Sequence, residues 1–129
     1  MTKRKAKILI VDDAQINRII LCELLRNQYQ ILEAEDGKKA LEIMKEDKMI
    51  DLVLLDIVMP NMDGYRLTQR IRQLGLTLPV IGVTANALAE EKQRCLESGM
   101  DSCLSKPVTL DVLKQTLTVY AARVRKGRE

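Results

Sequence analysis

Three aspartates, one threonine and one lysine stand at the ends of apolar runs. Asp12 and Asp13 follow ILIV, Asp56 follows LVLL, Thr84 follows VIGV, and Lys106 follows a weaker run. Three carboxylates that lie close together repel one another unless a cation offsets their charge. Mg²⁺ commonly does so, bound beside one or two carboxylates and a phosphate. The pattern therefore predicts a Mg²⁺ site, with the Lys106 ammonium free to pair with Asp56 or a phosphoryl oxygen.

Each of these residues also has an ordinary structural role. Asp12 or Asp13 could cap the helix that follows, Asp56 could cap a turn, and Thr84 and Lys106 are common loop residues. Taken one at a time, these roles are the better interpretation. Taken together they leave the repulsion among three carboxylates unexplained, so the metal site is favoured.

Short apolar strands that alternate with helices would bring these positions together. The runs at 8–11, 52–55 and 80–83 are apolar on both faces, as is typical of strands covered on both sides, and weaker runs at 31–34 and 102–105 predict strands nearer the edges. Five strands, each followed by a helix, predict a doubly wound (βα)5 α/β fold. We expect a flavodoxin-like three-layer sandwich with a five-stranded parallel sheet, filling residues 1–129 as one domain. Its functional crevice would lie at the carboxyl ends of the strands.

Apolar residues at helical spacing predict the buried faces of the helices. One stripe consists of Ile16, Ile19, Ile20 and Leu24. Another helix begins after Thr109, a good N-cap residue. The helix at 87–98 has a thin apolar stripe around a charged middle, EEKQR, so we expect it to be among the more mobile elements.

Composition excludes several other kinds of site. The 129 residues include no histidine, which removes His-based catalysis, imidazole zinc sites and a phosphohistidine of the chain's own. The three cysteines lack C-x-x-C spacing, which argues against a disulfide framework or a metal cluster. Aromatic residues make up 2%, too few for base stacking, so we expect no nucleic-acid partner. Without a signal peptide or a membrane span, we expect a cytoplasmic protein.

The motifs ILIVDD, LLDIVMPNMDG, VTAN and SKP, in this order and spacing, resemble the receiver domain of two-component response regulators. The resemblance runs from about Lys7 to about Arg123. From about Met59 onward the chain is especially similar to the C-terminal receivers of hybrid sensor kinases of the Rcs phosphorelay, whereas the first half is similar to a more generic receiver. A divergent relative and a spliced chimera would both give this pattern.

The resemblance implies a role for each matching residue. Asp56 would accept a phosphoryl group from the phosphohistidine of a histidine kinase or a histidine phosphotransfer domain, and Thr84 and Lys106 would contact that group. The Mg²⁺ ligands would be Asp12, Asp13, Asp56 and the backbone carbonyl of Val58. The chain would then be a monomeric phosphoacceptor that catalyses only its own phosphotransfer and autodephosphorylation. It would be either a free-standing regulator or a fragment of a hybrid histidine kinase.

One position departs from the family's pattern. Many receivers carry Tyr or Phe three residues before the lysine, and this ring turns inward as the threonine engages phosphate; here that position is Cys103. The departure puts in doubt an output switch that couples Thr84 to an aromatic ring, and it leaves the phosphorylation chemistry intact. We expect the response to phosphorylation to concentrate in residues 84–98, with little change around Cys103.

Three other functions fit part of the pattern. A Mg²⁺-dependent phosphohydrolase with an aspartate nucleophile carries a second Asp two residues after the nucleophile, but Asp12 and Asp13 are adjacent, and Val58 stands two residues after Asp56. A flavodoxin-type binding module needs a first loop rich in glycine and hydroxyls, and this loop begins with two aspartates. An interaction domain with a vestigial acidic pocket would show no Mg²⁺-dependent response to a phosphoryl donor.

Overall fold

Five parallel strands form one sheet in the order β2-β1-β3-β4-β5. The computed structural model describes residues 5–57, 63–85, 88–106 and 108–128. The strands are β1 (Lys7–Val11), β2 (Gln30–Ala34), β3 (Leu52–Asp56), β4 (Val80–Thr84) and β5 (Ser102–Ser105). The apolar runs thus locate the strands to within a residue, and the two weaker runs form the edges of the sheet, as predicted.

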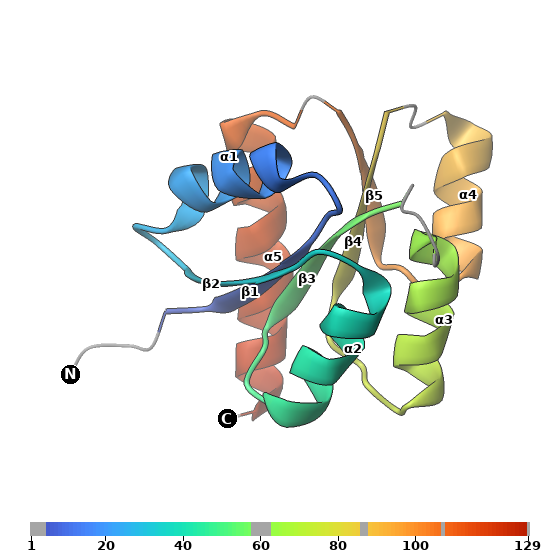
Figure 1. Cartoon of the computed structure of the whole chain (residues 1–129), viewed down its shortest axis with the longest axis horizontal. Helices are drawn as coiled ribbons and strands as arrows, with labels where there is room; N and C mark the ends of the chain where they lie inside the picture. Colours follow the sequence, from blue (N-terminus) through green and yellow to red (C-terminus); the bar gives the residue numbers. More distant parts are fainter. Residues whose placement is uncertain (1–4, 58–62, 86–87, 107, 129) are drawn as a thin grey trace.

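Helices cover both faces of this sheet (Figure 1). They are α1 (Gln15–Leu25), α2 (Gly37–Glu46), α3 (Gly64–Gln73), α4 (Ala89–Glu97) and α5 (Leu110–Arg128). Side chains alternate between the faces of a strand, so Ile8, Ile10 and Leu54 join the core under α1 and α5, while Leu9, Val11 and Leu55 join the core under α2, α3 and α4. The predicted doubly wound three-layer fold is confirmed. In the described part of the chain, no helix is both long and apolar enough to span a membrane.

The apolar stripe predicted for α1 does not face the core. Ile16, Ile19, Ile20 and Leu24 are 62, 47, 51 and 40% exposed. The helix instead turns Leu21, Cys22 and Leu25 toward the sheet. Both sets of residues recur at helical spacing, so periodicity alone could not decide between them. The result is a helix with a second apolar face in solvent.

The turn into α3 brings this helix against the end of β3. Asp63 caps it, because its carboxylate accepts a hydrogen bond from Arg66 N at 2.8 Å. A Cβ atom at Gly64 would lie 2.7 Å from Ile57 Cα, so only glycine permits this close approach. Gly64 N also donates to Ile57 O at 2.7 Å, which anchors the first turn of α3 beside the carboxyl end of β3.

The helix α4 is held by few apolar contacts, as its sequence predicts. Cys95 is its one buried residue, while Leu96 and the N-cap residue Leu88 are 58 and 63% exposed. By contrast, α5 packs through the fully buried Leu113 and Leu117. The predicted cap of α5 is confirmed, because Val112 N donates to Thr109 Oγ1 at 3.3 Å.

Candidate functional site

The strand register brings the polar positions to one edge of the sheet. Val11 of β1 pairs with Leu55 of β3, so Asp12 and Asp56, the next residues, both stand at the carboxyl edge. Thr84 closes β4 opposite Ser105 of β5, directly before Lys106. Since all five strands are parallel, their carboxyl ends meet in one crevice, as expected for this fold.

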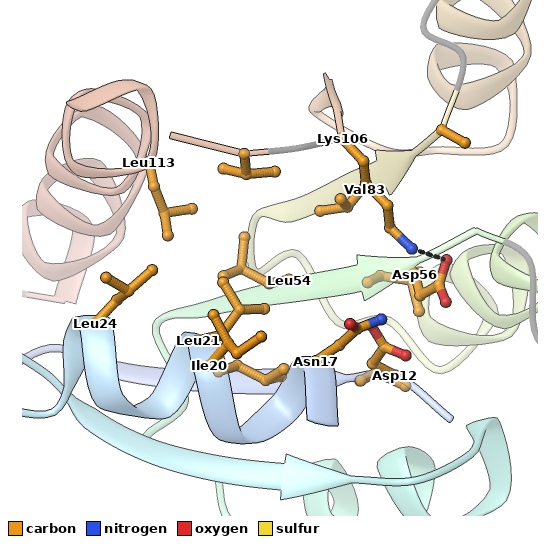
Figure 2. A pocket seen from close by; sticks show the side chains of 15 residues that line it. Asp12, Asn17, Ile20, Leu21, Leu24, Leu54, Asp56, Val83, Lys106 and Leu113 are labelled. Carbon is orange, nitrogen blue, oxygen red and sulfur yellow. Dashed lines mark hydrogen bonds and ion pairs between the residues drawn. The ribbon is translucent and has the colours of Figure 1, made fainter. Parts of the chain in front are cut away.

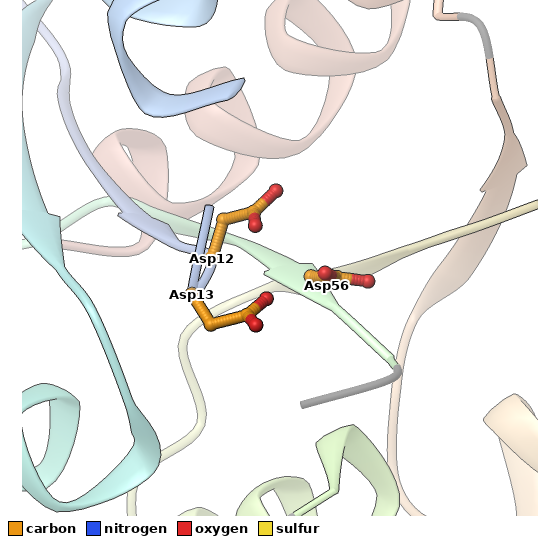
Figure 3. Close-up of side chains that lie close together, drawn as sticks. All are labelled: Asp12, Asp13 and Asp56. Atoms are coloured by element: carbon orange, nitrogen blue, oxygen red, sulfur yellow. The ribbon is translucent and has the colours of Figure 1, made fainter. Parts of the chain in front are cut away.

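Three carboxylates gather in that crevice (Figure 3). Carboxylate oxygens of Asp12, Asp13 and Asp56 all lie within 4.8 Å of one another. Asp12 and Asp56 are buried, at 5 and 7% exposure, while Asp13 is exposed. Hard oxygen donors at this spacing are the chemistry that Mg²⁺ prefers, so the donor set fits this ion. An exposed carboxylate beside two buried ones also gives the ion a route from solvent.

One ammonium, from the residue that follows β5, faces the carboxylates (Figure 2). Lys106 Nζ lies 3.5 Å from Asp56 Oδ1, and the Lys106 side chain is 36% exposed. Its backbone is fixed to the neighbouring strand, because Lys106 N donates to Thr84 O at 2.7 Å. A single ammonium cannot neutralise three carboxylates, so the cluster keeps a net negative charge that favours a further cation.

The hydroxyl of Thr84 is directed toward α4. Thr84 is 4% exposed, and its Oγ1 donates to Glu91 Oε1 across 3.5 Å. Cys103 lies half-buried on β5, against the core cluster that contains Cys95. Burial, with a hydrogen bond to Cys95, raises the pKa of the Cys103 thiol to about 12. This thiol therefore stays protonated and apolar in character at neutral pH.

Two residues that position Asp12 were not singled out from the sequence. Asn17 Nδ2 donates to Asp12 Oδ2 at 3.3 Å, while the other oxygen, Oδ1, accepts from Ala14 N at 2.9 Å. Arg18 Nη1 donates to the backbone Asp12 O at 2.6 Å, and Arg18 Nε lies 3.3 Å from a carboxylate oxygen of Glu33. Asn17 and Arg18 are the third and fourth residues of α1, and their place in the first turn after the aspartate pair was the available signal.

The capping interpretation of Asp12 and Asp13 is wrong for this helix. The N-cap residue of α1 is Ala14, and it makes no side-chain capping bond. The carboxylate of Asp12 instead fixes the loop that precedes the helix. Val58, the fourth predicted metal ligand, lies outside the described residues, as does Pro107.

A cavity of about 410 Å³ opens beside the carboxylates (Figure 2). Asp12, Asp56 and Lys106 line its polar end, and much of the remaining lining is apolar side chains of the strands, of α1 and of α5, among them Ile20 and Leu24. Its volume falls in the usual range of ligand pockets. The exposed apolar face of α1 thus continues directly into the acidic crevice.

Sequence comparison places the chain among signalling receivers. The response regulator receiver domain family matches residues 8–118. Sensor histidine kinase RcsC of Escherichia coli is 72% identical over 123 residues, which are 95% of this chain and 13% of that protein. Sensor protein EvgS of Escherichia coli strain K12 is 45% identical over 115 residues, 88% of this chain and 10% of that protein. The chain therefore spans about an eighth or less of the length of these relatives.

Solved structures give the same result. The solution structure of the Escherichia coli RcsC C-terminus containing the phosphoreceiver domain has a TM-score of 0.81 at 68% identity, covering 100% of this chain and 97% of that one. The chemotaxis protein CheY4 of Vibrio cholerae has a TM-score of 0.84 at 28% identity, covering 90% and 98%. The similarity predicted for the second half is confirmed, and at 95% coverage it includes the first half. These matches support a receiver over the phosphohydrolase alternative.

Proposed function

The chain belongs to the response regulator receiver domain family, and from this premise we propose that Asp56 is its phosphoacceptor. Asp56 is the buried carboxylate at the end of the central strand β3, with Asp12 on one side and Lys106 on the other. This convergence of two further carboxylates and one ammonium on a single buried aspartate is the observation that carries the proposal. We also propose that residues 1–129 form one receiver domain.

The proposed reaction is a transfer of a phosphoryl group onto a carboxylate oxygen. An oxygen of Asp56 bonds to phosphorus while the bond from phosphorus to the donor's imidazole nitrogen breaks, and the electron pair leaves with that nitrogen. Lys106, already 3.5 Å from Asp56, would pair with a phosphoryl oxygen, and the Thr84 hydroxyl would donate to another. Attack of water on phosphorus would return the free carboxylate and inorganic phosphate.

Receiver domains generally bind Mg²⁺ at an acidic pocket, and we propose that Asp12, Asp13 and Asp56 hold it here. Their oxygens, within 4.8 Å of one another, form the required hard donor set. When bound, the ion supplies positive charge that offsets the carboxylates and the arriving phosphoryl group. Asn17 and Arg18 hold Asp12 in place before any ion arrives, through its carboxylate and its carbonyl oxygen.

The phosphoryl donor would be a histidine kinase or histidine phosphotransfer domain, since the chain has no histidine of its own. The exposed apolar face of α1 and the adjoining cavity offer such a partner a docking surface beside Asp56. We propose that the chain acts as a monomer in the cytoplasm. Its free cysteines, Cys22, Cys95 and Cys103, support a reducing compartment.

Labelling with a small phosphodonor tests the assignment of Asp56. Incubation with acetyl phosphate and Mg²⁺ should add one phosphate, measured by intact mass spectrometry. Asp56→Asn should acquire none, because the amide is not a nucleophile of this kind. Asp51→Asn is the matched control: Asp51 is a buried aspartate at the other end of β3, and this variant should still be labelled. Labelling that persists in Asp56→Asn would refute the assignment.

A further inference from the structure

Glu91 lies in the first turn of α4, at the point where this helix meets the site. It is half-buried, and its Oε1 accepts the hydrogen bond from Thr84 Oγ1. The donor–acceptor distance, 3.5 Å, is at the long end for a hydroxyl, so this bond is weak and easily exchanged. A cavity of about 200 Å³ lined by Thr84, Leu88, Glu90 and Glu91 leaves room for the two groups to separate.

The Glu91 carboxylate also faces Tyr65, on the neighbouring helix α3. The Tyr65 hydroxyl is buried, and burial together with the Glu91 carboxylate raises the pKa of this phenol. One turn further along α4, the Arg94 guanidinium carbon lies 4.5 Å from the centroid of the Tyr65 ring. Glu91 and Arg94 thus both approach one side chain of α3, and the same Glu91 carboxylate accepts the bond from Thr84.

A hydroxyl has one proton to donate. In the structure, the Thr84 proton is directed to Glu91; in the phosphorylated protein it must be directed to a phosphoryl oxygen on Asp56. These two hydrogen bonds exclude each other. The free energy of the Thr84–Glu91 hydrogen bond is therefore subtracted from the free energy that Thr84 gains on binding a phosphoryl oxygen.

We propose that Glu91 is a positioning residue, which holds the Thr84 hydroxyl on α4 and must release it before Thr84 can engage a phosphoryl group. The inference rests on the proposed function, since it takes Thr84 as a phosphoryl contact. It adds a residue of α4 to the site and gives a physical link between phosphorylation and this helix. Release costs little elsewhere, because Cys95 is the one residue that α4 buries.

The test measures the apparent affinity for beryllofluoride, a phosphoryl mimic, in the presence of Mg²⁺. Amide NMR titrations of the full chain would follow the wild type, Glu91→Ala and Glu90→Ala. Glu90 is the matched control because it is exposed, lies in the same turn and carries the same charge. We expect Glu91→Ala to bind about two- to threefold more tightly, as loss of one weak competing hydrogen bond predicts, and Glu90→Ala to bind like the wild type.

A double-mutant cycle separates this role from a general effect on stability. In a Thr84→Val background the hydroxyl is gone, so adding Glu91→Ala should leave the lower beryllofluoride affinity of that background unchanged. Equal affinity of Glu91→Ala, Glu90→Ala and the wild type would overturn the positioning role, as would a gain that persists without the Thr84 hydroxyl. A wild type that fails to bind the mimic at Asp56 would instead overturn the proposed function, and the positioning role with it.

Discussion

Removal of the Asp56 charge should stabilise the metal-free protein. The Asp56→Asn side chain keeps its shape, loses repulsion from Asp12 and Asp13 within 4.8 Å, and loses attraction to Lys106 at 3.5 Å. At an effective dielectric constant of about 20, each repulsion is about 3.5 kcal/mol and the attraction about 4.7 kcal/mol. Two repulsions outweigh one attraction by about 2 kcal/mol, and solvent screening of the exposed Asp13 and of Lys106 reduces this to about 1 kcal/mol.

Thermal unfolding with and without Mg²⁺ measures this balance. For a domain of this size, about 1 kcal/mol corresponds to a rise in Tm of roughly 3 to 5 °C. Mg²⁺ should raise the Tm of the wild type, because binding to the folded state stabilises it, and should raise that of Asp56→Asn much less. In the control Asp51→Asn, loss of a charged acceptor 2.8 Å from Lys7 N should lower the Tm with and without Mg²⁺. A lower Tm of metal-free Asp56→Asn, or an equal Mg²⁺ effect on it and the wild type, would refute the electrostatic reasoning.

Two further predictions concern α1 and Cys103. Ile20→Glu should slow phosphotransfer from a phosphohistidine donor about fivefold more than labelling by acetyl phosphate, because a charge would disrupt the apolar docking face. The control is Val119→Glu, at a similarly exposed position of α5. An equal loss of phosphotransfer rate in both variants would contradict the docking surface. Burial raises the pKa of the Cys103 thiol from 9.0 to about 12. Above pH 9 the unfolded chain therefore loses a thiol proton that the native protein keeps. Since deprotonation then favours the unfolded state, the free energy of unfolding should fall as pH rises toward 12. Urea unfolding at pH 8 and 10.5 should show a smaller fall for Cys103→Ser, and an identical fall would contradict this pKa.

The sequence predicted the sheet well because strands apolar on both faces leave no choice of orientation. The run at 52–55 is buried whichever face it turns, so it could only be a central strand. The helix α1 offered a choice between two apolar faces, Ile16 and Ile20 on one and Leu21 and Leu25 on the other. Packing against the sheet determines which face is buried, and no feature of the local sequence indicates that contact. The outward face is the better candidate for a partner because folding does not use it.

The same limit applies inside the site. Asp12, Asp56 and Lys106 could be predicted because parallel strands end at one edge, and topology alone brings those ends together. Glu91 could not, because it stands in the run EEKQR, where a charged side chain usually faces solvent. Only tertiary packing of α4 brings the Glu91 carboxylate within hydrogen-bonding distance of the Thr84 hydroxyl and beside Tyr65.

The replacement of an aromatic ring by Cys103 changes what a moving Thr84 can do. A ring three residues before Lys106 could swing as Thr84 leaves, and this would carry the change to the surface of β5. A small thiol, half-buried against Cys95, has little area to expose or bury. We therefore expect displacement of Thr84 to act mainly by releasing Glu91, on a helix anchored by one buried residue. A signal transmitted through α4 in this way stays close to Asp56, where a docked partner could sense it and accept the phosphoryl group.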